Sequence, residues 1–221
     1  MPGRSGFLLP AAVGDASARY DLTKFTWIGT GQPANLVLWT RKGAGIRTFD
    51  EMQRSKREIV VGGLTQGSST TVLPVLMAKY MKSPIKVVAG YPGTAETMLA
   101  LQRGEVDGHF AQAASVSPEL ITSGESVPIV ALFEGEQGVP GLEKLITDAK
   151  FMAMFNLLTA PSRVWLALIG TPNMPTEAVA LLRKAYADMA SSKEYQDEAR
   201  ARGFSTALDR RVDALRILMA H

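Results

Sequence analysis

The sequence predicts an α/β fold with parallel sheets, and three observations support this prediction. Short apolar, β-branched runs alternate along the chain with segments of helical periodicity, which is the pattern of strands joined by crossover helices. The chain has 221 residues, of which 46% are hydrophobic and 20% charged, enough for one large domain or two small lobes. Two loops of small residues lie where a strand gives way to a helix. Because crossover connections are right-handed, we expect the strands to run parallel.

The N-terminal part predicts two strands and a short helix. Phe25–Gly29 and Asn35–Thr40 are β-branched and aromatic runs separated by a turn sequence, Gly31-Gln32-Pro33. Thr48 and Glu51 have the spacing of a capping box, so a helix is expected to begin immediately after Thr48.

The stretch from Glu58 to Ser115 predicts a strand–loop–helix arrangement that occurs twice. Glu58–Leu64 is a strand of the buried type, and the helix after it must begin between Ser69 and Thr71, because Pro74 is tolerated only in the first turn. The elements expected next are a strand at Ile85–Ala89, a helix that stops at Arg103-Gly104, and a strand at Val106–Ala111.

The C-terminal half continues the alternation. Phe151–Ala160 fits either a helix or a strand, and periodicity does not separate the two. Along the helix after Pro175, Val179, Leu182, Tyr186 and Met189 share one face. The other expected elements are a helix from Ser117 to near Gly124, a strand Val127–Phe133, a helix Leu142–Ala149, a strand Trp165–Ile169, a helix Glu194–Arg202, and a helix from Asp209 to Leu218.

Composition and motifs exclude several classes of function. There is no cysteine, so disulfides, thiolate nucleophiles and cysteine-ligated metals are excluded. No metal-ligand cluster occurs, and no cofactor is expected. The 24 basic and 21 acidic residues are interspersed, which argues against a nucleic-acid partner. The most apolar region, Phe151–Gly170, is interrupted by polar residues and is too broken to span a membrane. The first residues do not form a convincing signal peptide.

The two small-residue loops predict a site for a small anion. Each loop leads into a helix N-terminus, where free N–H groups and the helix dipole favour a carboxylate. Gly62–Ser69 has the glycine spacing of a P-loop but carries serine where the phosphate-binding lysine would stand, so nucleotide hydrolysis is disfavoured. The candidate ligand-binding residues are Thr65, Gln66, Gly67, Ser68, Ser69 and Thr70 in the first loop, and Tyr91, Pro92, Gly93, Thr94 and Ala95 in the second. The alternative interpretation is that these residues only cap helices and form turns.

Asp107 and His109 leave an enzyme open as an alternative. They alternate along a predicted strand, so both side chains could reach one cleft as an acid/base pair in a transferase or hydrolase. Solvated or structural roles are the more ordinary interpretation. The tryptophans Trp27, Trp39 and Trp165 are expected to be core residues.

Several segments together resemble one protein family. These are Arg19–Thr30 (RYDLTKFTWIGT), Val60–Leu76 (VVGGLTQGSSTTVLPVL), Val87–Gly108 (VVAGYPGTAETMLALQRGEVDG) and Pro172–Tyr186 (PNMPTEAVALLRKAY). They are similar to the TctC/Bug family, the extracytoplasmic solute receptors of tripartite tricarboxylate transporters. The similarity extends over nearly the whole chain from about Ala18.

The resemblance implies a periplasmic, two-lobed, Venus-flytrap receptor that is not an enzyme. It implies that the chain binds a small organic anion, such as a carboxylate or an amino acid, and delivers it to membrane transporter subunits. We expect a monomer. The lobe boundaries expected are 1–42 and 165–221 for an incomplete first lobe with C-terminal helices, and 43–164 for a second lobe that carries the ligand-binding loops.

Carried over by position, the resemblance adds residues to the site and marks two departures. Asp107, Phe110 and Gln112 join the candidate ligand-binding residues, with Asp107 in the family's Gly-x-Val-Asp motif. Pro92 replaces a lysine of the family's second loop. The family's signal peptide, first strand and glycine-rich loop have no counterpart ahead of Ala18. The expectation is therefore an N-terminally truncated receptor, periplasmic if a signal peptide lies upstream of Met1, or a remnant that binds nothing.

Overall fold

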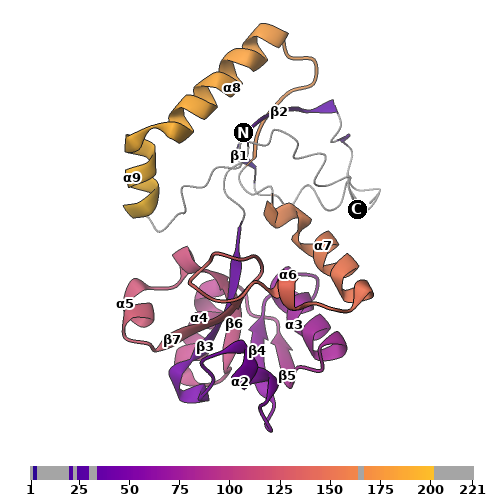
Figure 1. The fold of residues 1–221 in the computed structure, drawn as a ribbon, viewed down its shortest axis with the longest axis vertical. Coiled ribbons are helices and arrows are strands. Elements are labelled where there is room, and N and C mark those ends of the chain that lie inside the picture. Colours follow the sequence, from indigo (N-terminus) through magenta and orange to yellow (C-terminus); the bar gives the residue numbers. More distant parts are fainter. Residues whose placement is uncertain (1, 4–19, 22–23, 30–33, 164–166, 202–221) are drawn as a thin grey trace. The chain divides into compact units, whose positions relative to one another are not determined.

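The computed structural model describes residues 2–3, 20–21, 24–29, 34–163 and 167–201 (Figure 1). The chain divides into two compact units: unit 1 takes residues 1–34 and 156–221, and unit 2 takes residues 35–155. The boundaries expected from the sequence were at 42 and 164. The strand Leu36–Arg41, which we expected in the first lobe, belongs instead to the sheet of unit 2.

Unit 2 is built on a five-stranded sheet in the order β5-β4-β6-β3-β7 (Figure 1). Its strands are β3 (Leu36–Arg41), β4 (Ile59–Gly63), β5 (Ile85–Ala89), β6 (Gly108–Gln112) and β7 (Ser126–Ala131). β4 pairs in parallel with β5 and with β6, as the alternating pattern predicts.

The prediction of an all-parallel sheet is wrong for β3, which pairs antiparallel with both β6 and β7. Only a short 3-10 helix (Lys42–Ala44) and the short helix α2 (Phe49–Gln53) lie between β3 and β4. No long crossover helix carries the chain back along the sheet here, so β3 ends at the edge where β4 begins. The strand is therefore inserted in the opposite direction.

Helices cover both faces of this sheet, and two adjacent glycines show which helix lies on which face. A Cβ on Gly62 would lie 2.6 Å from Thr97 Cγ2 in α4 (Thr94–Arg103), and one on Gly63 would lie 3.1 Å from Thr71 Cα in α3 (Ser69–Tyr80). Successive residues of a strand point to opposite faces, so α4 and α3 pack on opposite sides of β4. Glycine permits this close approach at both positions.

The core of unit 2 lies between the sheet and these helices. Val37, Trp39, Met98 and Leu101 belong to a buried cluster on the α4 face, and Trp39 Nε1 donates to Ala111 O at 3.2 Å. The core role expected for Trp39 is confirmed, since its side chain is fully buried. The remaining helices of unit 2 are α5 (Pro118–Thr122) and α6 (Leu142–Leu145).

Helix α7 (Ala149–Arg163) resolves the ambiguous stretch Phe151–Ala160 as helix, and it runs from unit 2 into unit 1. Phe151 and Phe155 are fully buried, with Phe151 stacked on Tyr80 and Phe155 edge-on to Phe133. Phe151 and Phe155 lie one turn apart on the same helical face, and the burial of this face decides between helix and strand, which the residue pattern left open.

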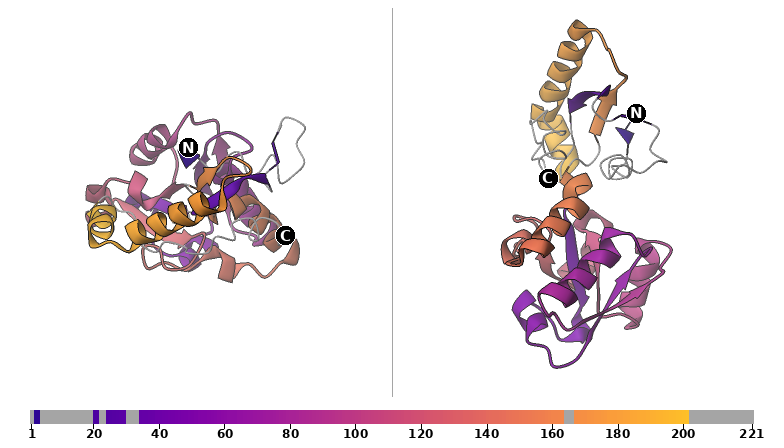
Figure 2. Two further views of the ribbon diagram at one scale, coloured as in Figure 1. Left: turned by 90° about the horizontal axis from the view of Figure 1, so that it is seen from above. Right: turned by 90° about the vertical axis from the view of Figure 1, so that its right-hand side faces the viewer.

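Unit 1 contains a small antiparallel sheet in the order β1-β8-β2, made of β1 (Pro2–Gly3), β8 (Ala167–Gly170) and β2 (Thr26–Gly29). It also contains α8 (Thr176–Ser191) and α9 (Lys193–Ala201), which follow one another in Figure 2. Arg183 of α8 donates to Trp27 O through Nε at 3.1 Å and Nη2 at 2.9 Å, and a Cβ on Gly29 would overlap the ring of Tyr186. Trp27 is buried, as expected.

Some sequence predictions fall outside the described residues or are shortened. Trp165 and the helix expected from Asp209 to Leu218 lie outside them. The predicted helix Leu142–Ala149 is only four residues long, and the predicted strand Val127–Phe133 is β7, which ends at Ala131. Thr48 caps α2 as predicted, accepting a hydrogen bond from Glu51 N at 3.1 Å. Among the helices described, none combines the length and apolar character needed to cross a membrane.

Candidate functional site

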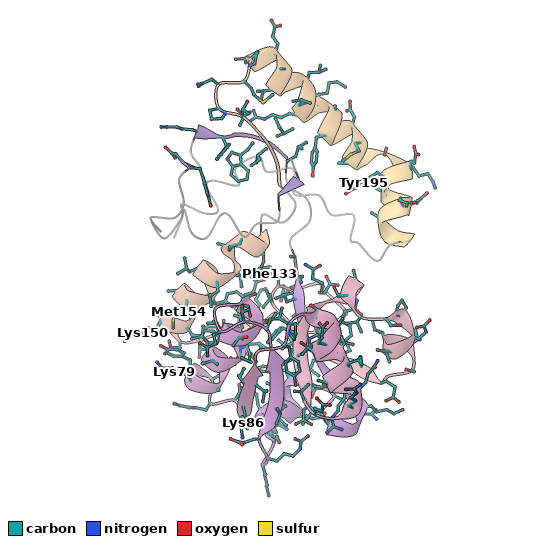
Figure 3. All side chains as sticks on the ribbon, turned by 180° about the vertical axis from the view of Figure 1, so that it is seen from behind. Lys79, Lys86, Phe133, Lys150, Met154 and Tyr195 are labelled. Carbon is teal, nitrogen blue, oxygen red and sulfur yellow. The ribbon has the colours of Figure 1, made fainter. Side chains whose placement is uncertain are left out.

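The two predicted loops lie side by side at the carboxyl edge of the parallel strands of unit 2. Gly90 N donates to Leu64 O at 2.8 Å and Tyr91 N donates to Gly63 O at 3.3 Å, so the loop after β5 is bonded directly to the loop after β4. Figure 3 shows Lys86, at the start of β5, and Phe133, just beyond β7, at opposite ends of the unit. Carboxyl ends of parallel strands meet at one edge, which is where open α/β sheets bind ligands.

The first loop is held by a network of hydroxyl groups centred on Ser68. Ser68 Oγ donates to Thr65 O at 2.8 Å and lies 2.9 Å from Thr70 Oγ1 and 3.2 Å from Thr71 Oγ1. Thr70 Oγ1 also accepts from Leu64 N at 3.3 Å. The hydroxyls therefore hold the loop together where α3 begins, at Ser69, which lies within the predicted range Ser69–Thr71. The reason given for that range is wrong, because Pro74 is the sixth residue of α3 and lies beyond its first turn.

The start of α3 leaves backbone donors free. The N–H groups of Ser69 and Thr70 donate to no group of the described residues, because the carbonyls that precede them do not continue the helix. No acidic residue lies in the first turn of α3. Twelve residues of aligned peptide dipoles follow, so this end of the helix favours an anion.

The second loop presents another helix N-terminus, but one that carries its own carboxylate. Gly93 is the N-cap of α4, and its carbonyl accepts from Thr97 N at 3.2 Å and Thr97 Oγ1 at 2.9 Å. Glu96 folds back over the cap, since a Cβ on Gly93 would lie 2.8 Å from Glu96 Oε2. The two helix ends are therefore electrostatically unequal: the α3 end is free of acid and the α4 end has Glu96.

The structure brings most predicted site residues to this edge. Gln66, Gly67, Pro92 and Ala95 are exposed there in the two loops, and Tyr91 is half-buried with its ring 3.4 Å from the position of a Cβ on Gly62. Gln112 ends β6 opposite Leu36, the first residue of β3, so it lies at the same edge as the loops. Its side chain is half-buried.

Phe110 is not placed with them. Its side chain is only 2% exposed and belongs to the core, on the face of β6 opposite to His109. The structure gives it a packing role.

Asp107 is at the other end of the sheet, where the parallel strands begin. Its Oδ2 accepts from Val60 N at 3.0 Å and from Arg57 Nη1 at 2.7 Å, and its Oδ1 accepts from Arg41 Nη2 at 2.9 Å. Burial alone raises the pKa of Asp107, but the hydrogen bonds from Arg57 and Val60 and the two arginine charges outweigh it and lower the pKa. Asp107 is thus an ionised structural residue that ties β3, β4 and β6 together.

His109 does not form an acid/base pair with Asp107. Its Nε2 lies 2.7 Å from Met98 Sδ under α4, and its side chain is 2% exposed. Burial lowers the pKa of His109 to about 4, so the imidazole is neutral near pH 7. A neutral, enclosed imidazole and a carboxylate held by two arginines offer no catalytic dyad.

Reasoning from the sequence missed both partners of Asp107, Arg41 and Arg57. Arg57 lies just before the parallel strand β4, and Asp107 lies just before the parallel strand β6. Arg57 Nη2 also donates to Ala44 O at 2.9 Å. That shared position was a detectable signal, since residues preceding adjacent parallel strands lie at one edge. No group of three or more His, Cys, Asp or Glu side chains in the described ranges could hold a metal ion.

Comparison with known proteins finds the fold in solved structures. No family model and no curated protein sequence matches the chain. A TctC solute-binding protein from Polaromonas aligns with a TM-score of 0.71 at 18% identity, covering 97% of this chain and 71% of that one. MatC from Rhodopseudomonas palustris with bound malate aligns with a TM-score of 0.60 at 17% identity, covering 96% of this chain and 71% of that one. An R. palustris protein with adipate aligns with a TM-score of 0.59 at 19% identity, covering 91% of this chain and 66% of that one.

These likenesses confirm the predicted fold. Because the sequence identities are below 20%, these alignments show a shared fold and do not show a shared ligand. The chain has the two-lobed α/β fold of periplasmic solute-binding proteins, and proteins of the TctC and Bug type are among those it resembles at the level of structure.

Proposed function

We propose that the chain is a non-enzymatic receptor for a small organic anion, a carboxylate or an amino acid, which it binds at the carboxyl edge of unit 2. The observation that carries this proposal is the pair of free backbone N–H groups, of Ser69 and Thr70, at the start of α3. A helix N-terminus contributes ~0.3–1 kcal/mol to anion binding, and each charge-assisted hydrogen bond about 1.5–3 kcal/mol.

The magnitude of binding shows what else such a site needs. A micromolar dissociation constant corresponds to about 8 kcal/mol, more than two such hydrogen bonds and one dipole supply. The remaining contacts belong to the second loop, Tyr91–Ala95, and to Gln112, which lie at the same edge. Malate and adipate occur as ligands in structures with this fold. We therefore expect carboxylates of about that size to bind here.

The family resemblance extends the proposal to partners and place. The chain would act in the periplasm as a monomer and pass its ligand to the membrane subunits of a tripartite tricarboxylate-type transporter. The enzyme alternative loses its support, because the structure holds Asp107 and His109 in separate structural environments. A remnant that binds nothing remains the outcome to test against.

Proline substitution tests the site with minimal disturbance of the fold. Ser69 is the first residue of α3, and Ser68 has φ −74° and ψ 149°, a conformation compatible with a following proline. Ser69→Pro removes a free N–H while keeping the helix. Calorimetry against malate, adipate, aspartate and glutamate should show at least tenfold weaker binding of whichever ligand binds the parent chain.

A matched control is available at the start of α8. Thr176 is also a first helical residue, and the preceding Pro175 has φ −55° and ψ 133°, so Thr176→Pro makes the same change in unit 1. It should leave the affinity unchanged. Absence of binding by the parent chain to every ligand in the panel would contradict the receptor, as would equal affinities in the parent and the Ser69→Pro variant.

A further inference from the structure

A cavity lies in unit 2 at the opposite edge of the sheet from the two loops. Its volume is about 260 Å³, and it is lined by Arg41, Gly43, Leu101, Gln102, Leu120, Glu125 and Ser126. β3 ends at Arg41 and β7 begins at Ser126, which pair across the sheet, so the cavity belongs to the edge where the parallel strands begin. None of its lining residues belongs to the proposed receptor site.

The guanidinium of Arg41 is not fully used by the protein. Its Nη2 donates to Asp107 Oδ1 at 2.9 Å, but its Nε is buried without a hydrogen-bond partner among the described residues. Buried donors are rarely left unpaired in proteins. The Arg41 side chain as a whole is 29% exposed, so a polar group in the cavity can reach the guanidinium. Gly43 leaves room for the guanidinium, since a Cβ there would lie 2.6 Å from Arg41 Nη1.

The remaining walls supply an opposite charge, two neutral polar groups and an apolar side. Glu125 carries a carboxylate at the rim and pairs with Lys42 at 3.2 Å, with both side chains about half exposed. Ser126 is 2% exposed, and Gln102 contributes an amide. Leu120 is partly exposed and provides hydrocarbon surface, whereas Leu101 is 1% exposed and belongs to the core behind the wall. An exposed pair such as Glu125–Lys42 contributes little stability, so Glu125 is available to another cation.

We propose that this cavity is an accessory binding site for a small zwitterion, an α-amino acid with an aliphatic side chain. The ligand carboxylate is placed toward Arg41 and Ser126, its ammonium group toward Glu125, and its side chain against Leu120. The volume is that of about nine water molecules at ~30 Å³ each, which leaves enough room for leucine. A dianion is disfavoured, because Asp107 already neutralises part of the charge on Arg41 and Glu125 is acidic.

The test is site-resolved NMR on the full chain labelled with ¹⁵N. L-leucine is titrated against its two halves, 4-methylpentanoate, which lacks the ammonium group, and 3-methylbutylamine, which lacks the carboxylate. L-leucine should change the chemical shifts of the backbone amides of Gln102 and Ser126 in a saturable way. Both 4-methylpentanoate and 3-methylbutylamine should bind at least about fivefold more weakly than L-leucine. The chemical shifts of the Ser69 and Thr70 amides report binding at the proposed receptor site separately. The experiment can therefore contradict the proposal for one site and leave the other standing.

Two variants and one control complete the experiment. Glu125→Gln and Ser126→Ala should each weaken leucine binding at the Gln102 amide by about fivefold or more. Glu134→Gln removes a comparably exposed acid, paired with Lys144 at 3.1 Å, and should have no effect. The proposal is overturned if leucine gives no saturable shift at Gln102 and Ser126, as expected of a cavity that holds only water, or if neither variant weakens binding.

Discussion

At the scale of single residues, unit 2 separates the groups that hold the fold from the groups that face a ligand. Asp107 makes all of its hydrogen bonds with Arg41, Arg57 and the backbone of β4, at the edge where the parallel strands begin. The free amides of Ser69 and Thr70 lie at the opposite edge. Substitutions at the two edges should therefore affect different measurements.

Asp107→Asn should destabilise the fold and leave ligand binding intact. The variant removes the negative charge that satisfies two arginines, so we expect a loss of about 2–3 kcal/mol in the free energy of unfolding, less than for a fully buried pair because Arg57 is half exposed. Urea denaturation measures the loss, and calorimetry on the folded variant measures affinity. Weaker ligand binding with unchanged stability would assign Asp107 to the ligand site instead.

His109 should make stability depend on pH below neutrality. Its pKa is about 4 in the folded state and about 6.5 when unfolded, so the unfolded chain binds more protons between these values. Stability is therefore present above pH 6.5 and lost as pH falls toward 4, by about 2 kcal/mol between pH 6.5 and pH 5.

The measurement is urea denaturation at both pH values with His109→Gln and His221→Gln. The sequence contains only these two histidines. His109→Gln should remove this part of the pH dependence, while His221→Gln should keep it. The same slope in both variants would show that His109 is not buried in its neutral form.

Glu96→Gln should tighten the binding of dicarboxylates. The Glu96 carboxylate lies over the N-cap of α4, where it opposes a second anionic group of the ligand. Removing the charge should improve the dissociation constant about two- to fivefold, by calorimetry at low salt. Glu177→Gln, which removes the acid from the first turn of α8, is the control. A weaker affinity in Glu96→Gln would mean that Glu96 contacts a donor group of the ligand.

At the scale of the elements, the site depends on how closely α3 and α4 approach β4. Gly63 faces α3 and Gly62 faces α4, and each lets a helix pack against the backbone of the strand. The loop of the first site spans only the residues between Gly63 and Ser69, so its shape follows from this packing.

Gly63→Ala should therefore affect both stability and binding. The added methyl group would contact Thr71 of α3 and displace the helix, at a cost of about 1–3 kcal/mol for overpacking. Because Ser69 and Thr70 move with α3, ligand affinity should fall as well. Gly67→Ala is the control for stability, since a Cβ there has no atom within 4 Å, and should change stability by less than about 0.5 kcal/mol. Unchanged stability in Gly63→Ala would show that α3 adjusts freely.

At the scale of the whole molecule, the chain forms two compact units. Unit 2 has a five-stranded sheet with helices on both faces, whereas the part of unit 1 that the structure describes has a sheet of three strands of two to four residues each. Hydrogen exchange should show greater protection in β3, β4 and β6 than in β2 and β8, because deeply packed strands open only with global unfolding. Equal protection in both sheets would indicate one cooperative unit.

The sequence by itself determined the fold class, the strand-to-helix order and the position of both loops. These depend on local signals, such as the Thr48 cap of α2 and Gly104 at the end of α4. Only the tertiary structure decided the direction of β3, the burial of Phe110 and the pairing of Asp107 with Arg41 and Arg57. Each depends on which strands are neighbours, and residues far apart in the chain determine that through packing rather than through local preference.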